Sequence, residues 1–363
     1  MFWKMRPGFS WVSLLMAAAF MALEMTGRAM DAMVLVRADQ VSSELVERWK
    51  AERYSAVALI LEEEEKPRCQ AAARMVHKAG LAVYFWIEVG RNPRLAAAHP
   101  EWMASLGMHN DWIKRFPNAR LPKENVEVAK AFPWVPIHYR AAFDAHLARV
   151  AELLAEMGAF RGVLLNDLQS GPSSCGCGNL LCRWATDYQV PATGEALNPE
   201  KAAADFVSAI AKRWPEKEII PVWTTECEEA DLPAAKAPGG RSTGLCGTVS
   251  CAVGRCPKEF STQWQAIATA TDGPIGLLGL ESELERAEGG AESMLEYALR
   301  VPAKHGAPEM PARRIWLVVD AAAESAARLD AVRKVAMQHG IARLIMAQTR
   351  IDQSYEPRII RVK

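Results

Sequence analysis

Residues 162–168, which read Gly-Val-Leu-Leu-Asn-Asp-Leu, decide the fold. A short apolar run with a carboxylate at its end is typical of a strand that is buried on both faces of a parallel sheet. Similar runs rich in Val, Ile, Leu and aromatic residues lie at 33–39, 56–62, 82–88, 219–225, 275–281, 315–320 and 343–349. The sequence therefore predicts eight buried strands.

Amphipathic segments separate these strands, at residues 41–52, 71–79, 139–157, 199–213, 257–270, 291–300 and 322–339. Strands that alternate with helices imply βαβ crossovers and a parallel sheet. Eight such units predict an α/β protein with a (β/α)8 TIM-type barrel. A doubly wound open sheet is the alternative, but no Gly-x-Gly-x-x-Gly or Walker-type phosphate loop follows any predicted strand.

The longest irregular stretches follow the predicted strands three, four and five, at residues 90–137, 169–198 and 226–258. In a barrel these loops all lie on the face formed by the carboxyl ends of the strands, where active sites are built. We therefore expect the functional site at this face.

Residues 1–29 have the pattern of a secretory signal peptide. Lys4 and Arg6 precede an apolar run at 11–25, and the small-residue segment 27–29 predicts cleavage after Ala29. A retained membrane anchor ranks second, because Glu24 interrupts a run shorter than the ~20 apolar residues of a membrane span. We expect a periplasmic or secreted protein whose residues 30–363 form a single barrel domain.

The composition is that of an ordinary globular protein, with 50% hydrophobic and 24% charged residues. The 43 basic and 43 acidic residues give a formal net charge of zero. This balance does not favour nucleic acid or, after cleavage of the signal peptide, a membrane surface as partner.

Carboxylates lie at or just past the ends of most predicted strands: Asp39, Glu62, Glu88, Asp167, Glu226, Glu281 and Asp320. A single one could be bonded to loop amides, but a ring of them at one rim requires solvent, a cation, a basic partner or a substrate. The set predicts a polar ligand, such as a carbohydrate or another polar small molecule.

A family resemblance adds to this interpretation. The segment His-Pro-Glu-Trp at 99–102, the Pro-Trp pair at 133–134, a long predicted helix and the strand at 161–167 together resemble barrel-fold glycoside hydrolases and their uncharacterised exported relatives. The resemblance covers residues 84–167. Arg161 stands where that family usually has Asp, Asn166 precedes Asp167, and the cysteine-rich loops are not typical of those hydrolases.

Glycoside hydrolysis needs two carboxyl groups on either side of one bond. Asp167 is the candidate nucleophile or charge stabiliser and Glu226 the candidate acid/base, since they follow adjacent predicted strands. Asp320 and Glu281 form the reserve pair. A protein that binds carbohydrate without catalysis is an alternative.

The substrate-binding candidates surround these carboxylates. Sugar rings present apolar faces that stack on indoles, so Trp86, Trp102, Trp134 and Trp223 are candidate platforms, with core packing as the alternative for each. The remaining candidates are polar: Glu88, His99 and Asn166.

The chain has eight cysteines: Cys69, Cys175, Cys177, Cys182, Cys227, Cys246, Cys251 and Cys256. In an oxidising compartment an even count predicts disulfides that hold the fourth and fifth loops together, with Cys69 completing the count. The alternative is a cysteine-ligated zinc or copper(I) centre, which would make this a metal-binding or redox protein on the same barrel. No other cofactor is expected.

Overall fold

The computed structural model describes residues 31–104, 118, 120–123, 126–168, 197–224, 267, 270–278, 311–322, 326–351 and 355–361. The predicted signal peptide and seven of the eight cysteines lie outside these residues. None of the helices in the described ranges is long and apolar enough to cross a membrane.

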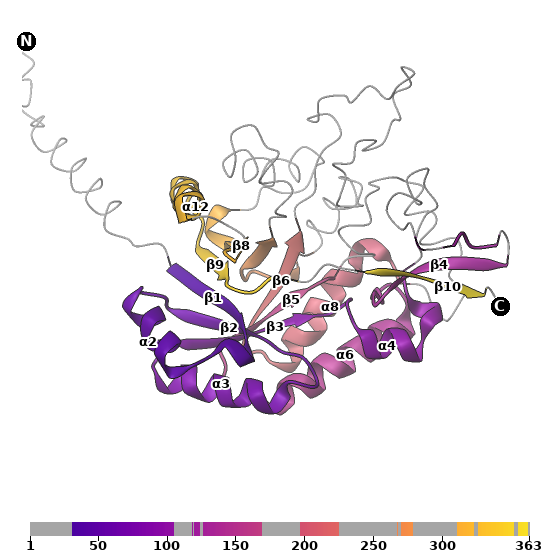
Figure 1. Cartoon of the computed structure of the whole chain (residues 1–363), viewed down its shortest axis with the longest axis horizontal. Coiled ribbons are helices and arrows are strands. Elements are labelled where there is room, and N and C mark those ends of the chain that lie inside the picture. Colours follow the sequence, from indigo (N-terminus) through magenta and orange to yellow (C-terminus); the bar gives the residue numbers. More distant parts are fainter. Residues whose placement is uncertain are drawn as a thin grey trace, which may run out of the picture.

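Eight parallel strands close into a barrel in the order β1-β2-β3-β5-β6-β7-β8-β9, and β9 pairs with β1 (Figure 1). They are β1 (Asp31–Arg37), β2 (Ala56–Ile60), β3 (Ala82–Glu88), β5 (Gly162–Asn166), β6 (Glu218–Thr224), β7 (Ile275–Leu278), β8 (Ile315–Asp320) and β9 (Arg343–Ala347). Each lies within or next to one of the eight predicted runs. The predicted (β/α)8 barrel is confirmed.

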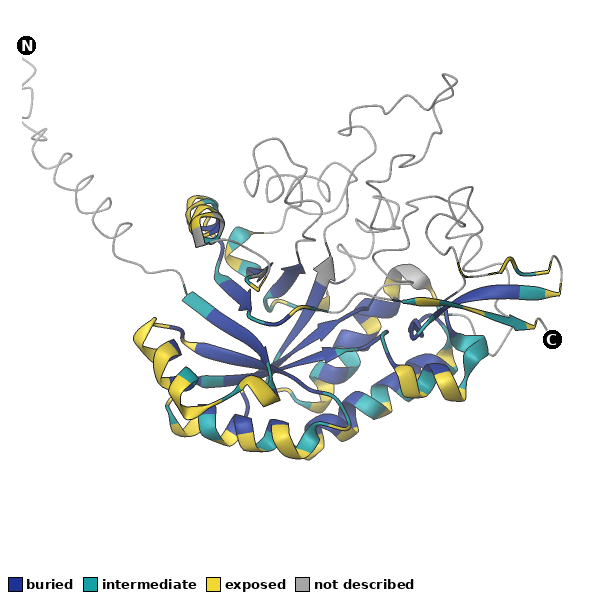
Figure 2. Ribbon diagram, viewed as in Figure 1, coloured by how far each residue is buried: buried dark blue, intermediate teal, exposed yellow. Residues whose placement is uncertain are grey.

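The strands bury both of their faces, so β2 and β5 are buried at every position. Side chains that include Tyr84, Trp86 and Leu164 fill the barrel interior. Side chains of the opposite parity, such as Phe85 and Val163, pack outward in the core cluster that includes the helices. Figure 2 shows buried strands and helices that expose only their outer surfaces.

The described helices between the strands are α2 (Ser43–Ala51), α3 (Lys66–Lys78), α6 (Arg140–Ala155), α8 (Pro199–Arg213) and α12 (Ala326–Gln338). Ser42 caps α2 by accepting a hydrogen bond from the backbone N of Leu45. After α3 and α12 the chain turns at Gly80 and Gly340, whose φ of +85° and +69° favour glycine. These five helices were predicted, whereas α4 (Pro93–Ala98) lies in the stretch after β3 that was expected to be irregular. The predicted helices at 257–270 and 291–300 fall largely or wholly outside the described residues.

A two-stranded antiparallel ribbon was not predicted. It joins β4 (Glu127–Phe132), within the long loop after β3, to β10 (Glu356–Arg361), near the end of the chain. Figure 1 shows the ribbon beside α4 (Pro93–Ala98), beyond the barrel wall. The guanidinium of Arg358 lies 3.2 Å from the ring centroid of Phe132. The ribbon gives the loop after β3 a framework of its own.

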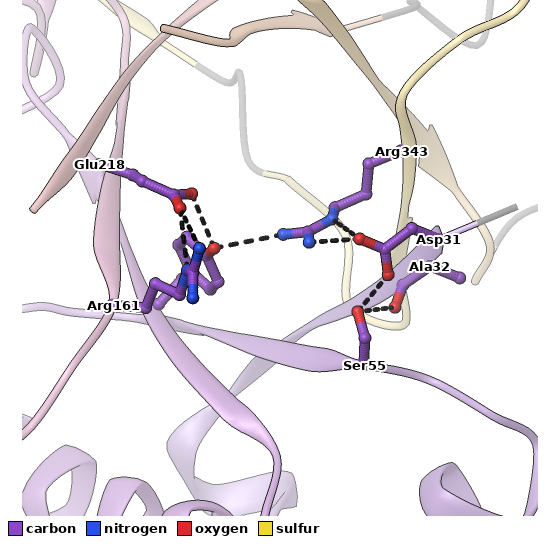
Figure 3. Close-up of polar contacts among 7 residues, drawn as sticks. Asp31, Ala32, Ser55, Arg161, Glu218 and Arg343 are labelled. Carbon is purple, nitrogen blue, oxygen red and sulfur yellow. Dashed lines mark hydrogen bonds and ion pairs between the residues drawn. The ribbon is translucent and has the colours of Figure 1, made fainter. Parts of the chain in front are cut away.

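A polar network closes the other end of the barrel, where the strands begin (Figure 3). Arg343 pairs with Asp31 and donates to the Tyr84 hydroxyl at 3.3 Å. That hydroxyl donates to Glu218 at 2.8 Å, and Arg161 pairs with the same carboxylate at 2.8 Å. Burial raises the pKa of Tyr84 to about 12, so its hydroxyl stays protonated. Arg161, which departs from the resembled family, thus lies at the end of the barrel remote from the predicted active face.

Candidate functional site

Three polar side chains converge where β3 and β5 end. Glu88 and Asn166 are register partners in these adjacent strands. The Asn166 Nδ2 donates to Glu88 Oε2 at 2.7 Å and to Asp167 Oδ1 at 3.2 Å. The sum of these distances, 5.9 Å, is the largest separation that the two carboxylate oxygens can have. The structure therefore brings two of the predicted carboxylates together on one amide group.

Hydrogen bonds hold Glu88 in place from both sides. Its second oxygen, Oε1, accepts from the indole Nε1 of Trp86 at 2.7 Å. Its backbone carbonyl accepts from Arg149, which also donates to Glu63 at 2.8 Å. Both oxygens of Glu88 thus accept hydrogen bonds, which fixes the orientation of this carboxylate.

Glu63 and Arg149 support this site from behind. Burial alone would raise the pKa of Glu63, but hydrogen bonds from Arg94 and Arg149 outweigh it and hold that pKa below its usual range. Glu63 therefore remains ionised and fixes the guanidinium of Arg149 under the end of β3. Sequence reasoning missed this pair, because Arg149 lies on α6, 86 residues from Glu63.

Asp167 has an unusual backbone. It is fully buried, and its φ of +59° lies in the left-handed region. Its carbonyl accepts from the backbone N of Gly90 at 3.0 Å. A Cβ on Gly90 would lie 2.6 Å from that oxygen and 3.4 Å from the Trp134 ring. Only glycine lets the loop after β3 approach Asp167 so closely, and such backbone outliers cluster at functional sites.

We expect the substitution Gly90→Ala to destabilise the protein by about 1–3 kcal/mol, because the added methyl group must displace the Asp167 carbonyl. Gly158→Ala is the matched control, since a Cβ there meets no atom within 4 Å. Urea unfolding of both variants measures the difference. Equal stability of the two variants would show that the approach of Gly90 to Asp167 is not tight.

Two of the predicted aromatic platforms lie in the core, which was the alternative for each of them. The Trp86 and Trp134 rings are fully buried within apolar clusters and present no face to a ligand. Trp86 points into the barrel core, and Trp134 packs with the small side chains Ala104, Ala129 and Ala131. These two indoles stabilise the site from within the core and do not form its surface.

Two separately predicted candidates, His99 and Trp102, lie against each other. Their rings stack with centroids 3.7 Å apart and planes 8° from parallel. The His99 side chain is 41% exposed, and its Nδ1 lies 3.4 Å from a carboxylate oxygen of Glu101. Trp102 is half-buried against the cluster that includes Met103 and Val135. This stack is an aromatic surface held on the loop after β3.

The remaining candidates are placed only in part. Asp320 is the last residue of β8 and Trp223 lies in β6, but the structure describes only the backbone of these two residues. In the strand order β8 lies opposite β3, so the Asp320 backbone stands across the mouth from Glu88. Glu226 and Glu281 lie outside the described residues. Their catalytic roles stay predictions.

The two other strand-end acids follow β1 and β2. Asp39 lies in the 3-10 turn η1 (Ala38–Gln40) after β1, and Glu62 pairs with Arg37 at 2.8 Å.

Cys69 differs from its expected pairing. It is a free, buried thiol whose Sγ donates to the carbonyl of Ile60 at 3.2 Å. Burial, and then the charges of Glu65 and Glu62, raise its pKa to about 12, which favours the protonated thiol. No group of three or more His, Cys, Asp or Glu side chains that could hold a metal ion occurs in the described part of the chain.

Comparisons with known proteins show likeness in structure only. No family model matches the chain, and neither does any curated protein. Among solved structures, the chain is similar to a GH36 alpha-galactosidase of Geobacillus stearothermophilus, with 10% identity and a TM-score of 0.38 over 86% of this chain and 42% of that chain.

Two other solved structures are similar at the same level. An O-GlcNAc hydrolase of Thermobaculum terrenum is 9% identical with a TM-score of 0.42, over 88% of this chain and 55% of that one. A pyruvate carboxylase of Rhizobium etli is 8% identical with a TM-score of 0.39, over 89% of this chain and 23% of that one. The chain thus spans less than half of the galactosidase, and likenesses at this level carry no argument about activity.

Proposed function

We propose that this protein is an exported, glycoside hydrolase-like barrel that acts on a carbohydrate at the mouth formed by the carboxyl ends of its strands. One observation carries the proposal: Glu88 and Asp167 both accept hydrogen bonds from the amide group of Asn166 at the ends of adjacent strands. A carboxylate at the mouth can stabilise the oxocarbenium-like transition state of glycoside cleavage.

The geometry favours different roles for the two carboxylates. Both oxygens of Glu88 accept hydrogen bonds, so we assign Glu88 an electrostatic and orienting role. Asp167 is the group that acts at the anomeric carbon, as nucleophile or charge stabiliser. The proton for the leaving oxygen then has to come from another residue, and Glu226 remains the predicted acid/base.

The ligand surface is the second part of the proposal. A sugar ring presents C–H groups on its faces, which pack on aromatic rings. The stacked pair His99 and Trp102 offers such a surface on the loop after β3. Backbone hydrogen bonds join the part of this loop that carries the stack to Gly90, whose backbone N donates to Asp167. The stack is therefore the proposed platform for a sugar unit.

A hydrolysis panel tests this function. Mature protein beginning at residue 30, purified without reductant or chelator, is incubated with aryl glycosides and oligosaccharides. We expect release of product from at least one substrate, and a fall in kcat of about 10²-fold in Glu88→Gln, because a preorganised charge is lost.

Glu216→Gln is the matched control, since Glu216 is 62% exposed and precedes β6 at the opposite end of the barrel. Equal activity of the two variants would remove Glu88 from the site. Saturable binding without turnover would identify a carbohydrate-binding protein. A thiol and metal count on the same sample tests the cysteine-ligated alternative, which requires a stoichiometric metal ion.

A further inference from the structure

We propose that Lys130 is a positioning residue that holds the His99–Trp102 stack in place, which rests on the proposed function of that stack as a sugar platform. Lys130 lies in β4 and is fully buried. Its Nζ donates to the backbone carbonyls of Glu101, at 3.2 Å, and Met103, at 2.9 Å. These two carbonyls belong to the residues before and after Trp102. One ammonium group therefore binds the backbone of the turn on both sides of Trp102.

A buried ammonium group is a costly way to fill this space. Ala104, Ala129, Ala131 and Trp134 form a buried apolar cluster at the same ribbon, where an uncharged side chain would pack at no cost in desolvation. Burial lowers the pKa of Lys130 to about 8, and the charge of Glu101 offsets this only in part. The desolvation cost of Lys130 is explained if its ammonium group is needed to hold the two carbonyls of the turn in place.

The turn itself has few other attachments to β4. Within the turn, Trp102 N donates to His99 O and Met103 N donates to Pro100 O, which shape the turn without anchoring it. Backbone bonds to the ribbon begin only at Ala104, which accepts from Ala131 at 2.8 Å. In the described part of the chain, Lys130 supplies the side-chain hydrogen bonds from β4 to the turn.

The same framework reaches the carboxylates. Ala104 N donates to the carbonyl of Trp134 at 2.9 Å, and the Trp134 ring lies beside Gly90. Gly90 in turn donates to Asp167. Lys130 thus completes one connected unit that sets the distance between the aromatic stack and the catalytic end of β5.

The test uses Trp102 as its own reporter. The chain has 12 tryptophans, so the fluorescence of Trp102 has to be isolated by subtraction. For each variant, the Trp102 signal is its fluorescence minus that of the same variant with Trp102→Phe added. In Lys130→Met we expect this signal to become more accessible to acrylamide, because the turn is released. Lys66→Met is the matched control, since Lys66 pairs with Glu156 on the outer surface of the barrel. The control should leave the signal unchanged.

A kinetic measurement separates positioning from general damage. With a substrate from the panel, Lys130→Met should raise KM by about tenfold and leave kcat within about twofold, because binding is lost equally in ground and transition states. A fall in kcat with KM unchanged would overturn the positioning role.

Two results keep the inference separate from the proposed function. The acrylamide measurement needs no ligand, so an unchanged Trp102 signal in folded Lys130→Met overturns the inference even if the protein cleaves glycosides. If Lys130→Met does not fold, hydrogen exchange of the unaltered protein decides. Residues 99–104 should be as protected as β4, and rapid exchange of that turn beside a protected β4 would contradict the role of Lys130. A panel that shows neither turnover nor saturable binding, together with a released Trp102 signal, would leave Lys130 as a positioning residue and reject the carbohydrate.

Discussion

Replacing Asp167 with Asn is expected to lower kcat by roughly 10³-fold or more, because the charge that acts at the anomeric carbon is lost. The substitution keeps the size of the side chain. Asn is also among the few residues that accept a positive φ, here +59°, and its Oδ1 can still accept from Asn166. The variant should therefore fold normally and still bind ligand. Steady-state kinetics together with circular dichroism measure both effects.

The size of the fall in kcat distinguishes the role of Asp167 from that of Glu88. Glu88→Gln is expected to lose less activity, because Glu88 only orients and adds charge. Turnover that persists in Asp167→Asn, with Glu88→Gln more impaired, would exchange the roles of the two carboxylates. Full activity in both variants would move the active centre away from the ends of β3 and β5.

The second large effect concerns stability. Arg343→Met is expected to reduce the free energy of unfolding by about 2–4 kcal/mol, since it removes a largely buried guanidinium that contacts Asp31, Tyr84 and Trp316 at once. The Arg343 side chain is only 14% exposed, pairs with Asp31 and lies 4.2 Å from the ring centroid of Trp316. It also donates to Tyr84, which links both sides of the network (Figure 3). Urea unfolding measures the loss.

Arg161→Met is the control for this prediction. Arg161 joins the same network through Glu218, but its side chain is 63% exposed. Exposed ion pairs contribute about 1 kcal/mol or less, so this variant should remain close to the unaltered protein. Kinetic constants per folded molecule should not change in either variant, because the network lies at the far end of the barrel. Equal destabilisation by both variants would refute the special role of Arg343.

The barrel was predictable because each of its strands is a short apolar run between amphipathic helices. A strand that is buried on both faces is apolar at nearly every position, and this pattern stays visible in the sequence even where a neighbouring turn or loop is unusual. The ribbon of β4 and β10 was missed for the opposite reason. β4 includes Glu127 and Lys130, β10 includes Pro357 and two arginines, and the two strands are more than 200 residues apart. Neither strand has a local pattern that distinguishes it from loop.

The site was predictable only in part. Acids at strand ends predict a polar mouth, and the adjacency of β3 and β5 follows from the barrel order once the ribbon is set aside. Composition could not separate the buried Trp86 and Trp134 from the half-exposed Trp102, since each of the three has an apolar residue directly after it. Lys130 and Arg149 act on backbone carbonyls 27 to 61 residues away, and such contacts leave no local pattern in the sequence.

Calorimetric titration of the inactive Asp167→Asn variant with an oligosaccharide panel tests the central claim most directly, because bound ligand is not consumed. We expect one saturable site per chain for at least one oligosaccharide. Adding Trp102→Ala should weaken binding by about tenfold, which corresponds to the upper part of the range for an aromatic contact. Adding Trp214→Ala, a tryptophan that follows α8 at the opposite end of the barrel, should leave the affinity unchanged. Absence of saturable binding across the panel, or equal effects of the two tryptophan substitutions, would contradict a carbohydrate site at the mouth of this barrel.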